Sequence, residues 1–427
     1  MKRRDFFKVT MPIVLPSLIS GVSLKALADS PLLRTMVRPA GSDRVLVLIQ
    51  LNGGNDGLNT VIPLEYYSAY HSARTNIAIP EDKVLRLEGF DGTGLHPAMP
   101  EMQQLFNTGK LTILQGVSYP QPNFSHFRAT DIWLTGADAG VVLQTGWAGR
   151  YLDQQYPRFP QDYPNTGMPD PLAIQVGSLV SPALQGPALT MGMAISNPNS
   201  FYDLIGDKVE TTANTRAGDQ LAYIREMAVK TDQYAGVIKK AAQKVTKQSD
   251  KYPAAGKNPL ADQLKIVARL VAGGLKTQIY LVSMGGFDTH AKQTDATDTT
   301  TGAHAKLLAK VSEAVNAFQD DLAYLQVGNR VMGMTFSEFG RRIQSNASGG
   351  TDHGSAAPVF VFGEGVKSGI IGQNPIIPDH LTVNDNVTMQ TDFRAIYCSI
   401  LEKWFQTDTV ETSAVLLKDY PVLPIIA

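Results

Sequence analysis

Acidic and imidazole side chains stand at the ends of several apolar segments of this 427-residue chain. The residues of this kind are Asp56, His126, Asp288, His290, Glu338 and His353. Several carboxylates cannot share one site in ionised form without a compensating cation. Carboxylates and imidazoles are also suitable ligands for Zn²⁺, Mn²⁺ and related ions. The pattern therefore predicts a divalent metal site, and its expected ligands are Asp56, Asp288, His290, Glu338 and His353.

A serine and a histidine, Ser125 and His126, stand where a helix is expected to begin after the apolar run 111–117. The backbone N–H groups at a helix N-terminus favour an anion. A serine in that position could act as a nucleophile when a metal activates it. We therefore predict Ser125 and His126 as catalytic residues. The residues expected to hold an anion or to support the ligands are Asn55, Arg341 and Asp352.

Each of these residues also has a purely structural interpretation. Asp56 could cap the glycine-rich turn 52–57, and Ser125 could cap its helix. Glu338 could pair with a nearby arginine, and His353 could be a buried histidine with satisfied hydrogen bonds. Their common placement at one edge of a sheet favours a shared site. The other histidines, interpreted as surface or packing residues, are His71, His96, His304 and His380.

The apolar runs are typical of strands that are buried on both faces. They span residues 44–51, 111–117, 277–284, 331–336 and 358–362. Helical spacing of apolar residues, or a helix-favouring composition, occupies 215–249, 264–271 and 308–322. This alternation predicts an α/β three-layer sandwich with a mostly parallel central sheet and helices on both faces. Ligands of such sheets bind beyond the carboxyl ends of the strands, so the site residues should meet there.

The first 28 residues are expected to be a twin-arginine signal peptide. Arg3 and Arg4 precede a weakly apolar stretch that contains two prolines, and Ala26 to Ala28 offers small residues for cleavage. A membrane anchor, the alternative, needs about 20 strongly apolar residues. We expect residues 29–427 to form one domain with a Pro/Gly-rich insertion at about 156–200 over one edge of the sheet. The twin-arginine translocase would be its export partner, and the mature protein would be periplasmic or secreted without a stable membrane span.

Charge and cysteine content narrow the function further. The leader holds five of the 38 basic residues and one of the 39 acidic residues, so the mature chain has 33 against 38. This balance argues against nucleic acid as a partner, because nucleic-acid binding needs a basic face. The single cysteine, Cys398, excludes an internal disulfide. A chain that folds in the reducing cytoplasm before export fits that composition.

Five motifs and the leader also carry a family resemblance. The motifs are Leu51 to Asn59, Asn123 to Phe127, Gly286 to His290, Ser337 to Arg341 and Gly350 to Gly354. Together they resemble the bacterial domain-of-unknown-function family 1501 over essentially the whole mature chain. That family is regarded as related to the alkaline phosphatase and sulfatase superfamily. The resemblance therefore implies an alkaline-phosphatase-like fold.

The superfamily pattern can be carried over to individual positions. The resemblance implies Ser125 as the nucleophile, Asp56 as an acidic ligand that follows the first strand, and His353 as the histidine before a later strand. The chain departs from the pattern in two places. The spacing from Asp288 to His290 is shorter than in the superfamily, and Phe339 stands where the superfamily has a ligand histidine. A single-metal site, an altered metal pair and a degenerate site are all left open.

The combined prediction is an exported hydrolase that acts on a phosphate or sulfate ester with a divalent metal ion, which would be Zn, Mn or Ca. The alternative is a non-catalytic periplasmic binding or assembly protein with a degenerate metal site, and Phe339 is the feature that favours it. A metal-dependent mutase or transferase is a third, weaker reading. The substrate, the number of ions and the oligomeric state do not follow from the sequence.

Overall fold

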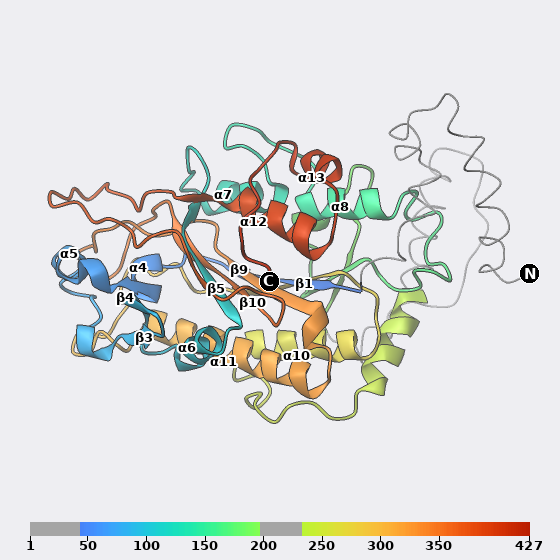
Figure 1. Ribbon diagram of the computed structural model, residues 1–427, viewed down its shortest axis with the longest axis horizontal. Helices are drawn as coiled ribbons and strands as arrows, with labels where there is room; N and C mark the ends of the chain where they lie inside the picture. Colours follow the sequence, from blue (N-terminus) through green and yellow to red (C-terminus); the bar gives the residue numbers. More distant parts are fainter. Residues whose placement is uncertain (1–42, 197–232) are drawn as a thin grey trace, which may run out of the picture. The chain divides into compact units, whose positions relative to one another are not determined.

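Strand β1 (Val45–Leu51) shows why this chain builds a layered structure. The computed structural model describes residues 43–196 and 233–427, and Figure 1 shows their arrangement. Val47 and Ile49 on one face of β1 belong to one apolar core, while Leu46 and Leu48 on the other face belong to a second. Successive side chains of a strand point to opposite faces, so an unbroken apolar run requires a cover on both sides.

A nine-stranded sheet lies at the centre of the described residues, in the order β11-β5-β10-β9-β1-β8-β6-β7, and β12 also pairs with β5. Its strands are β1, β5 (Leu111–Ser118), β6 (Ala173–Val176), β7 (Met193–Ile195), β8 (Ile279–Met284), β9 (Val331–Phe336), β10 (Ala357–Phe362), β11 (Gly369–Ile371) and β12 (Thr391–Asp392). All its neighbouring strands pair in parallel except β10, which is antiparallel to both β5 and β9. A small antiparallel sheet holds β2 (Val61–Pro63), β3 (Leu85–Leu87) and β4 (Phe90–Leu95).

The direction of β10 determines what reaches the carboxyl edge of the sheet. Strands β1, β5, β8 and β9 all end at that edge, because β5 and β9 are both antiparallel to β10. Strand β10 begins there, so the turn that precedes it, 350–356, lies beside the loops that follow the other strands. A parallel β10 would have placed this turn at the opposite edge.

Helices cover both faces of the sheet (Figure 1). The side that contains Val47 packs against α6 (Pro100–Asn107), α10 (Pro259–Ala272) and α11 (Ala303–Tyr324). The side that contains Leu46 packs against α7 (His126–Thr135), α8 (Trp147–Gln155), α12 (Phe393–Ser399) and α13 (Thr409–Leu416). Two further short helices, α4 (Gly57–Thr60) and α5 (Tyr67–Ala73), follow β1.

Helix α10 illustrates how local signals set the boundaries. Asn258 accepts a hydrogen bond from the Ala261 backbone N–H as the N-cap, and Pro259 occupies the first helical position. Leu264 and Val267 are fully buried, which gives the helix its apolar face. At its end, a side chain on Gly273 would come within 2.3 Å of the Ala241 carbonyl oxygen. The close approach of residues 233–244, which are helical, therefore requires glycine at this position.

The predicted fold class is confirmed, as are the five strands expected from the apolar runs and the helices expected at 264–271 and 308–322. The helix expected at 215–249 lies partly outside the described residues and ends at 244. The segment at about 156–200 differs from the expectation, because it supplies β6 and β7 to one edge of the sheet instead of only lying over that edge.

Residues Asp43–Ala427 form one compact unit, and the expected signal peptide lies outside the described residues. No helix in the described ranges has the length and apolar character that a membrane crossing requires.

Candidate metal centre

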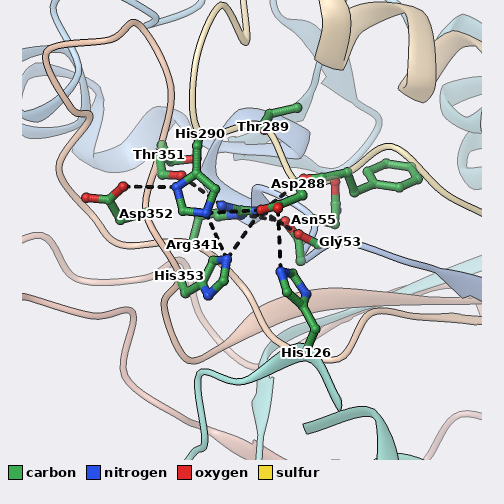
Figure 2. Close-up of polar contacts among 12 residues, drawn as sticks. Gly53, Asn55, His126, Asp288, Thr289, His290, Arg341, Thr351, Asp352 and His353 are labelled. Atoms are coloured by element: carbon green, nitrogen blue, oxygen red, sulfur yellow. Dashed lines mark hydrogen bonds and ion pairs between the residues drawn. The ribbon is translucent and has the colours of Figure 1, made fainter. Parts of the chain in front are cut away.

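Four ligand-type side chains converge at the carboxyl edge of the sheet, and we refer to His126, Asp288, His290 and His353 as the His/Asp cluster. Asp288 and His290 lie on the loop after β8, His126 begins α7 after β5, and His353 precedes β10. Figure 2 shows the three imidazole rings directed toward the Asp288 carboxylate. Three of the seven histidines therefore meet around one acid, although up to 227 positions separate them along the chain.

The distances within the His/Asp cluster are short. Asp288 Oδ1 lies 3.1 Å from His290 Nε2 and 3.3 Å from His353 Nε2, and Asp288 Oδ2 lies 3.6 Å from His126 Nε2. The Nε2 atoms of His290 and His353 are 2.9 Å apart. Ligand atoms of His126, Asp288 and His353 all lie within 4.8 Å of one another, which is a spacing that one metal ion could bridge.

The Nδ1 atoms of the three rings all have oxygen partners. The acceptors are the Phe124 carbonyl for His353 (2.8 Å), the Asp352 carboxylate for His290 (3.1 Å) and the Glu338 carboxylate for His126 (2.7 Å). A neutral ring that donates from Nδ1 keeps a lone pair on Nε2, and the three Nε2 atoms all face the Asp288 carboxylate. Two lone pairs 2.9 Å apart repel each other unless a proton or a metal cation lies between them.

Protonation in the cluster suits metal binding at neutral pH. Burial raises the pKa of Asp288, but the hydrogen bond and charge of Arg341 and the neighbouring histidines lower it more, so the net pKa is below the ordinary value. Burial lowers the pKa of His353, and the nearby Arg341 charge lowers it further against the opposing effect of the Phe124 carbonyl. An ionised aspartate and an uncharged imidazole are the forms that bind a metal.

Glu338 contacts the His/Asp cluster through the Nδ1 atom of His126 and does not point at its centre. The side chain is 2% exposed, and its Oε1 accepts from the Gly53 backbone N–H at 2.9 Å as well as from His126. The prediction of Glu338 as a direct ligand is therefore corrected: its carboxylate orients His126. Phe339, next in the chain, is also buried and packs against the rings of His126 and His353 at centroid distances of 4.9 and 4.6 Å.

Asp56 is likewise not directed at the cluster. Its carboxylate is fully buried and contacts Arg74 Nη1 at 2.6 and 2.8 Å and Gln293 Nε2 at 2.5 Å. Burial raises the pKa of Asp56, but the Arg74 and His304 charges and the two side-chain hydrogen bonds lower it more. The sequence-based assignment of Asp56 as a metal ligand is corrected, because both carboxylate oxygens already have protein partners.

The three residues expected to bind an anion or to support the ligands all have internal partners. Arg341 donates to Asp288 Oδ1 at 2.7 Å and to backbone carbonyls of the adjoining loops, so it positions Asp288. Asp352 orients His290 as a supporting residue. Asn55 is buried and accepts from His304 Nε2 at 2.9 Å, away from the cluster.

Ser125 lies beside the His/Asp cluster and is exposed. It is the N-cap residue of α7, yet its hydroxyl makes no capping hydrogen bond. Its two neighbours both contribute to the cluster, since the Phe124 carbonyl accepts from His353 and the next residue is His126. The capping interpretation of Ser125 therefore does not account for its hydroxyl, which is directed to no partner among the described side chains.

His96 and His304 were expected at the surface or in packing, and both are buried at 1% exposure. Burial lowers the pKa of His304 to about 4 and that of His96 to about 3. His304 donates from Nε2 to Asn55, so its Nδ1 is a lone-pair acceptor, and this atom is buried without a hydrogen-bond partner among the described residues. Protonation of His304 would therefore place a charge in the core with no hydrogen-bond partner for Nδ1, and the nearby Asp56 charge offsets this cost only in part.

We predict that His304 makes the protein less stable in mild acid. Its pKa is about 6.5 in the unfolded chain and about 4 when folded, so its contribution is complete above pH 6.5 and declines as pH falls toward 4. At pH 5 the expected loss is about 2 kcal/mol. Urea unfolding at pH 7 and pH 5 should show a smaller pH dependence for His304→Gln than for the wild type. The exposed His380→Gln serves as the control, and an unchanged pH dependence in His304→Gln would contradict the prediction.

Several residues around the cluster have no counterpart in the sequence-based site. Arg74 pairs with Asp56, and Gln293 bonds to Asp56, Thr289 and Thr351. The two threonines could have been suspected, because each lies within two positions of a cluster histidine. Nothing in the local pattern distinguishes Arg74 or Gln293 from a surface residue.

A comparison with models of protein families identifies the family of this chain. A model of the family described as "Protein of unknown function (DUF1501)" matches residues 119–415. No curated protein is significantly similar in sequence to this chain.

Among solved structures, the chain is similar to Ps i-CgsB in complex with k-i-k-neocarrahexaose, with 10% identity, a TM-score of 0.36, and coverage of 88% of this chain and 73% of that chain. It is similar to an alkaline phosphatase superfamily protein from Vibrio parahaemolyticus, with 12% identity, a TM-score of 0.35, and coverage of 78% of this chain and 62% of that chain. It is also similar to the PsFucS1 sulfatase from Pseudoalteromonas sp., with 11% identity, a TM-score of 0.35, and coverage of 81% of this chain and 70% of that chain.

Proposed function

We propose that this chain, which belongs to the DUF1501 family of proteins of unknown function, is a hydrolase of phosphate or sulfate esters that works with one bound divalent metal ion. The observation that carries the proposal is the convergence of three imidazole Nε2 atoms on the Asp288 carboxylate, with an oxygen acceptor at each Nδ1 atom. Hydrogen bonds from the other ring nitrogen to carboxylate or carbonyl oxygens are the usual support of metal-binding histidines. A cation between the Nε2 atoms of His290 and His353 would relieve the repulsion of two lone pairs 2.9 Å apart.

The donor set favours a particular class of ion. Three imidazole nitrogens and one carboxylate suit Zn²⁺ or a similar transition metal, whereas Ca²⁺ and Mg²⁺ prefer oxygen ligands. Of the three ions expected from the sequence, Zn and Mn therefore fit better than Ca. The engagement of Asp56 with Arg74 and of Glu338 with His126 removes two acids that a second ion would need, which supports a single ion. A divalent ion held there would supply Lewis-acid polarisation of an ester oxygen.

The other catalytic roles fall to residues around the cluster. The Ser125 hydroxyl, which makes no capping bond, would be the nucleophile toward phosphorus or sulfur. Its place at the start of α7 puts it beside the first backbone N–H groups of a helix, which favour the negative charge of a phosphate or sulfate group. His126 would hold the ion with its Nε2 while Glu338 fixes its ring. Asp288 would be held in place by Arg341.

Export remains part of the proposal. The leader predicts passage through the twin-arginine translocase, and a site filled before export would suit a protein that crosses the membrane folded. The periplasm or the exterior would then be the place of action, and an ester that reaches that compartment would be the substrate.

A non-catalytic binding or assembly role is the second candidate. The engagement of Asp56 and Glu338 with protein partners favours it, because a site with few acids could hold an ion for structure alone. Metal content and turnover, measured on the same purified protein, distinguish the hydrolase from the binding or assembly role.

We predict that the purified protein binds one equivalent of zinc or manganese and hydrolyses an aryl phosphate or an aryl sulfate. Elemental analysis after gel filtration measures the ion, and release of the phenol measures turnover before and after treatment with a chelator. His353→Ala should lose the ion, while His380→Ala, which changes an exposed histidine, should retain it. An absence of stoichiometric metal in the wild type would refute the proposal. Bound metal without turnover on either ester would support the binding role.

A further inference from the structure

We propose that Gln293 is a positioning residue that clamps the two ligand-bearing loops of the His/Asp cluster together. The inference rests on the proposed metal site and goes beyond it, because Gln293 touches none of the four ligands. It lies just past the β8 loop, its backbone N–H bonds to the Gly349 carbonyl at 2.8 Å, and its side chain is fully buried. The clamp consists of its single amide group and the partners on either side of it.

The oxygen end of the amide joins the two loops. Gln293 Oε1 accepts from the Thr289 hydroxyl at 2.9 Å and from the Thr351 hydroxyl at 2.9 Å. Thr289 stands between Asp288 and His290, and Thr351 stands two positions before His353. The backbone N–H of Thr351 also donates to the Thr289 carbonyl at 3.2 Å. One oxygen atom therefore connects the chain segments that carry three of the four ligands, and Figure 2 shows both threonines beside His290.

The nitrogen end anchors the clamp in the core. Gln293 Nε2 donates to Asp56 Oδ2 at 2.5 Å, and Asp56 is held by Arg74. Arg74 in turn donates to the Ile343 carbonyl at 2.7 Å, so the anchor reaches the loop that follows β9. Each of Gln293, Asp56 and Arg74 is 0% exposed, so these bonds are shielded from bulk solvent.

Only one orientation of the amide satisfies this environment. The Asp56 carboxylate only accepts, so the N–H end of the amide must face it; a flipped amide would set the amide oxygen against the carboxylate, whereas the two threonine hydroxyls can donate to the oxygen end. A glutamate at this position would place a second carboxylate against Asp56, and a leucine would remove the shared acceptor of the two hydroxyls and leave Asp56 with Arg74 alone of these two partners. Both ends of the Gln293 side chain therefore have defined partners. One of these partners is Asp56, the acid that the local sequence predicts as a metal ligand.

The clamp would fix the relative positions of two metal-binding histidines. His290 and His353 come from the two clamped loops, and their Nε2 atoms must both reach one ion. Loss of an outer partner of a metal site typically costs roughly 10- to 100-fold in metal affinity. We expect Gln293→Leu to fall in that range and to change how the ion is coordinated.

The test compares matched variants of the full protein. Zinc affinity is measured by competition with a chromophoric chelator, and the visible absorption of the Co²⁺-substituted protein reports the ligand geometry. Gln248→Leu is the control for Gln293→Leu, because Gln248 is also a buried glutamine that donates to a buried aspartate, Asp321, at 2.7 Å, but among α10 and α11 residues. Thr351→Val is a milder second variant, and Thr277→Val, which loses a hydroxyl bond of 2.7 Å before β8, is its control.

The inference predicts weaker zinc binding and an altered Co²⁺ spectrum in Gln293→Leu and Thr351→Val, with wild-type values in both controls. Wild-type affinity and spectrum in Gln293→Leu would overturn it, as would equal losses in a variant and its control. If Gln293→Leu does not fold, the zinc affinities and Co²⁺ spectra of Thr351→Val and Thr277→Val decide whether the inference holds. A wild-type protein that binds no metal at all would instead refute the proposed function.

Discussion

Ser125→Ala is expected to retain its fold and its bound ion but to lose turnover by a factor on the order of 1,000 or more. The hydroxyl is the only group on this side chain that can attack an ester, and alanine removes it without changing the backbone. The loss should appear in kcat, measured on the ester that the wild type hydrolyses, with metal content measured in the same preparation. A nucleophile that acts only in the reaction contributes to the transition state and not to the binding of the ion.

The stability of Ser125→Ala should change little. A capping serine normally contributes about 1 kcal/mol, but the hydroxyl of Ser125 makes no capping bond, so the expected change lies within about 0.5 kcal/mol. Ser72→Ala, an exposed serine on α5, is the control for a neutral substitution. If Ser125→Ala turned over at the wild-type rate, Ser125 would not be the nucleophile, and an unchanged cellular phenotype would favour the binding role.

Asp288→Asn is expected to lower metal affinity by more than about 100-fold, because loss of a direct ligand should exceed the cost of losing an outer partner. Asparagine has nearly the same shape but lacks the negative charge that three imidazoles and an ion would share. Arg341 would also lose its carboxylate partner, although its bonds to backbone carbonyls remain. Zinc competition titration measures the affinity, and thermal unfolding of the metal-free protein separates this effect from a loss of folding.

Asp82→Asn is the matched control for Asp288→Asn, since Asp82 is 73% exposed and pairs with the exposed Lys83. The control should keep the wild-type affinity. A result in which Asp288→Asn bound zinc as tightly as the wild type would show that the carboxylate at the centre of the cluster is not a ligand.

The edge of the sheet where the site lies could be predicted from sequence because it depends on local signals. The run Val331–Phe336 is largely apolar, and Glu338 follows two positions after its end. The same relation holds for Ile279–Met284 and Asp288. In a parallel sheet the position of a residue after its strand is enough to place it at the carboxyl edge.

The position of His353 could not be derived in this way. It precedes β10, so it reaches the carboxyl edge only because β10 runs antiparallel to β5 and β9. An apolar run such as Ala357–Phe362 has the same pattern in either direction, since side chains alternate between faces regardless of strand orientation. The resemblance to the superfamily indicated this position where the pattern of the residues could not.

Asp56 and Asp288 show the same limit for individual side chains. Both are acids in glycine-containing loops after a buried strand. Asp56 meets Arg74, 18 positions away, and Gln293, 237 positions away, whereas Asp288 meets three histidines. No feature within either loop distinguishes the two outcomes.

The amino-acid sequence by itself determined the α/β layers, the boundaries of the principal strands and the edge at which the reactive side chains gather. These depend on hydrophobic period and turn residues, which act over a few positions of the chain. Only the tertiary structure decided which acids face the centre and which are held by arginine, histidine or amide partners. That choice depends on contacts between residues far apart in sequence, and in a buried site each carboxylate keeps the partner that compensates its charge.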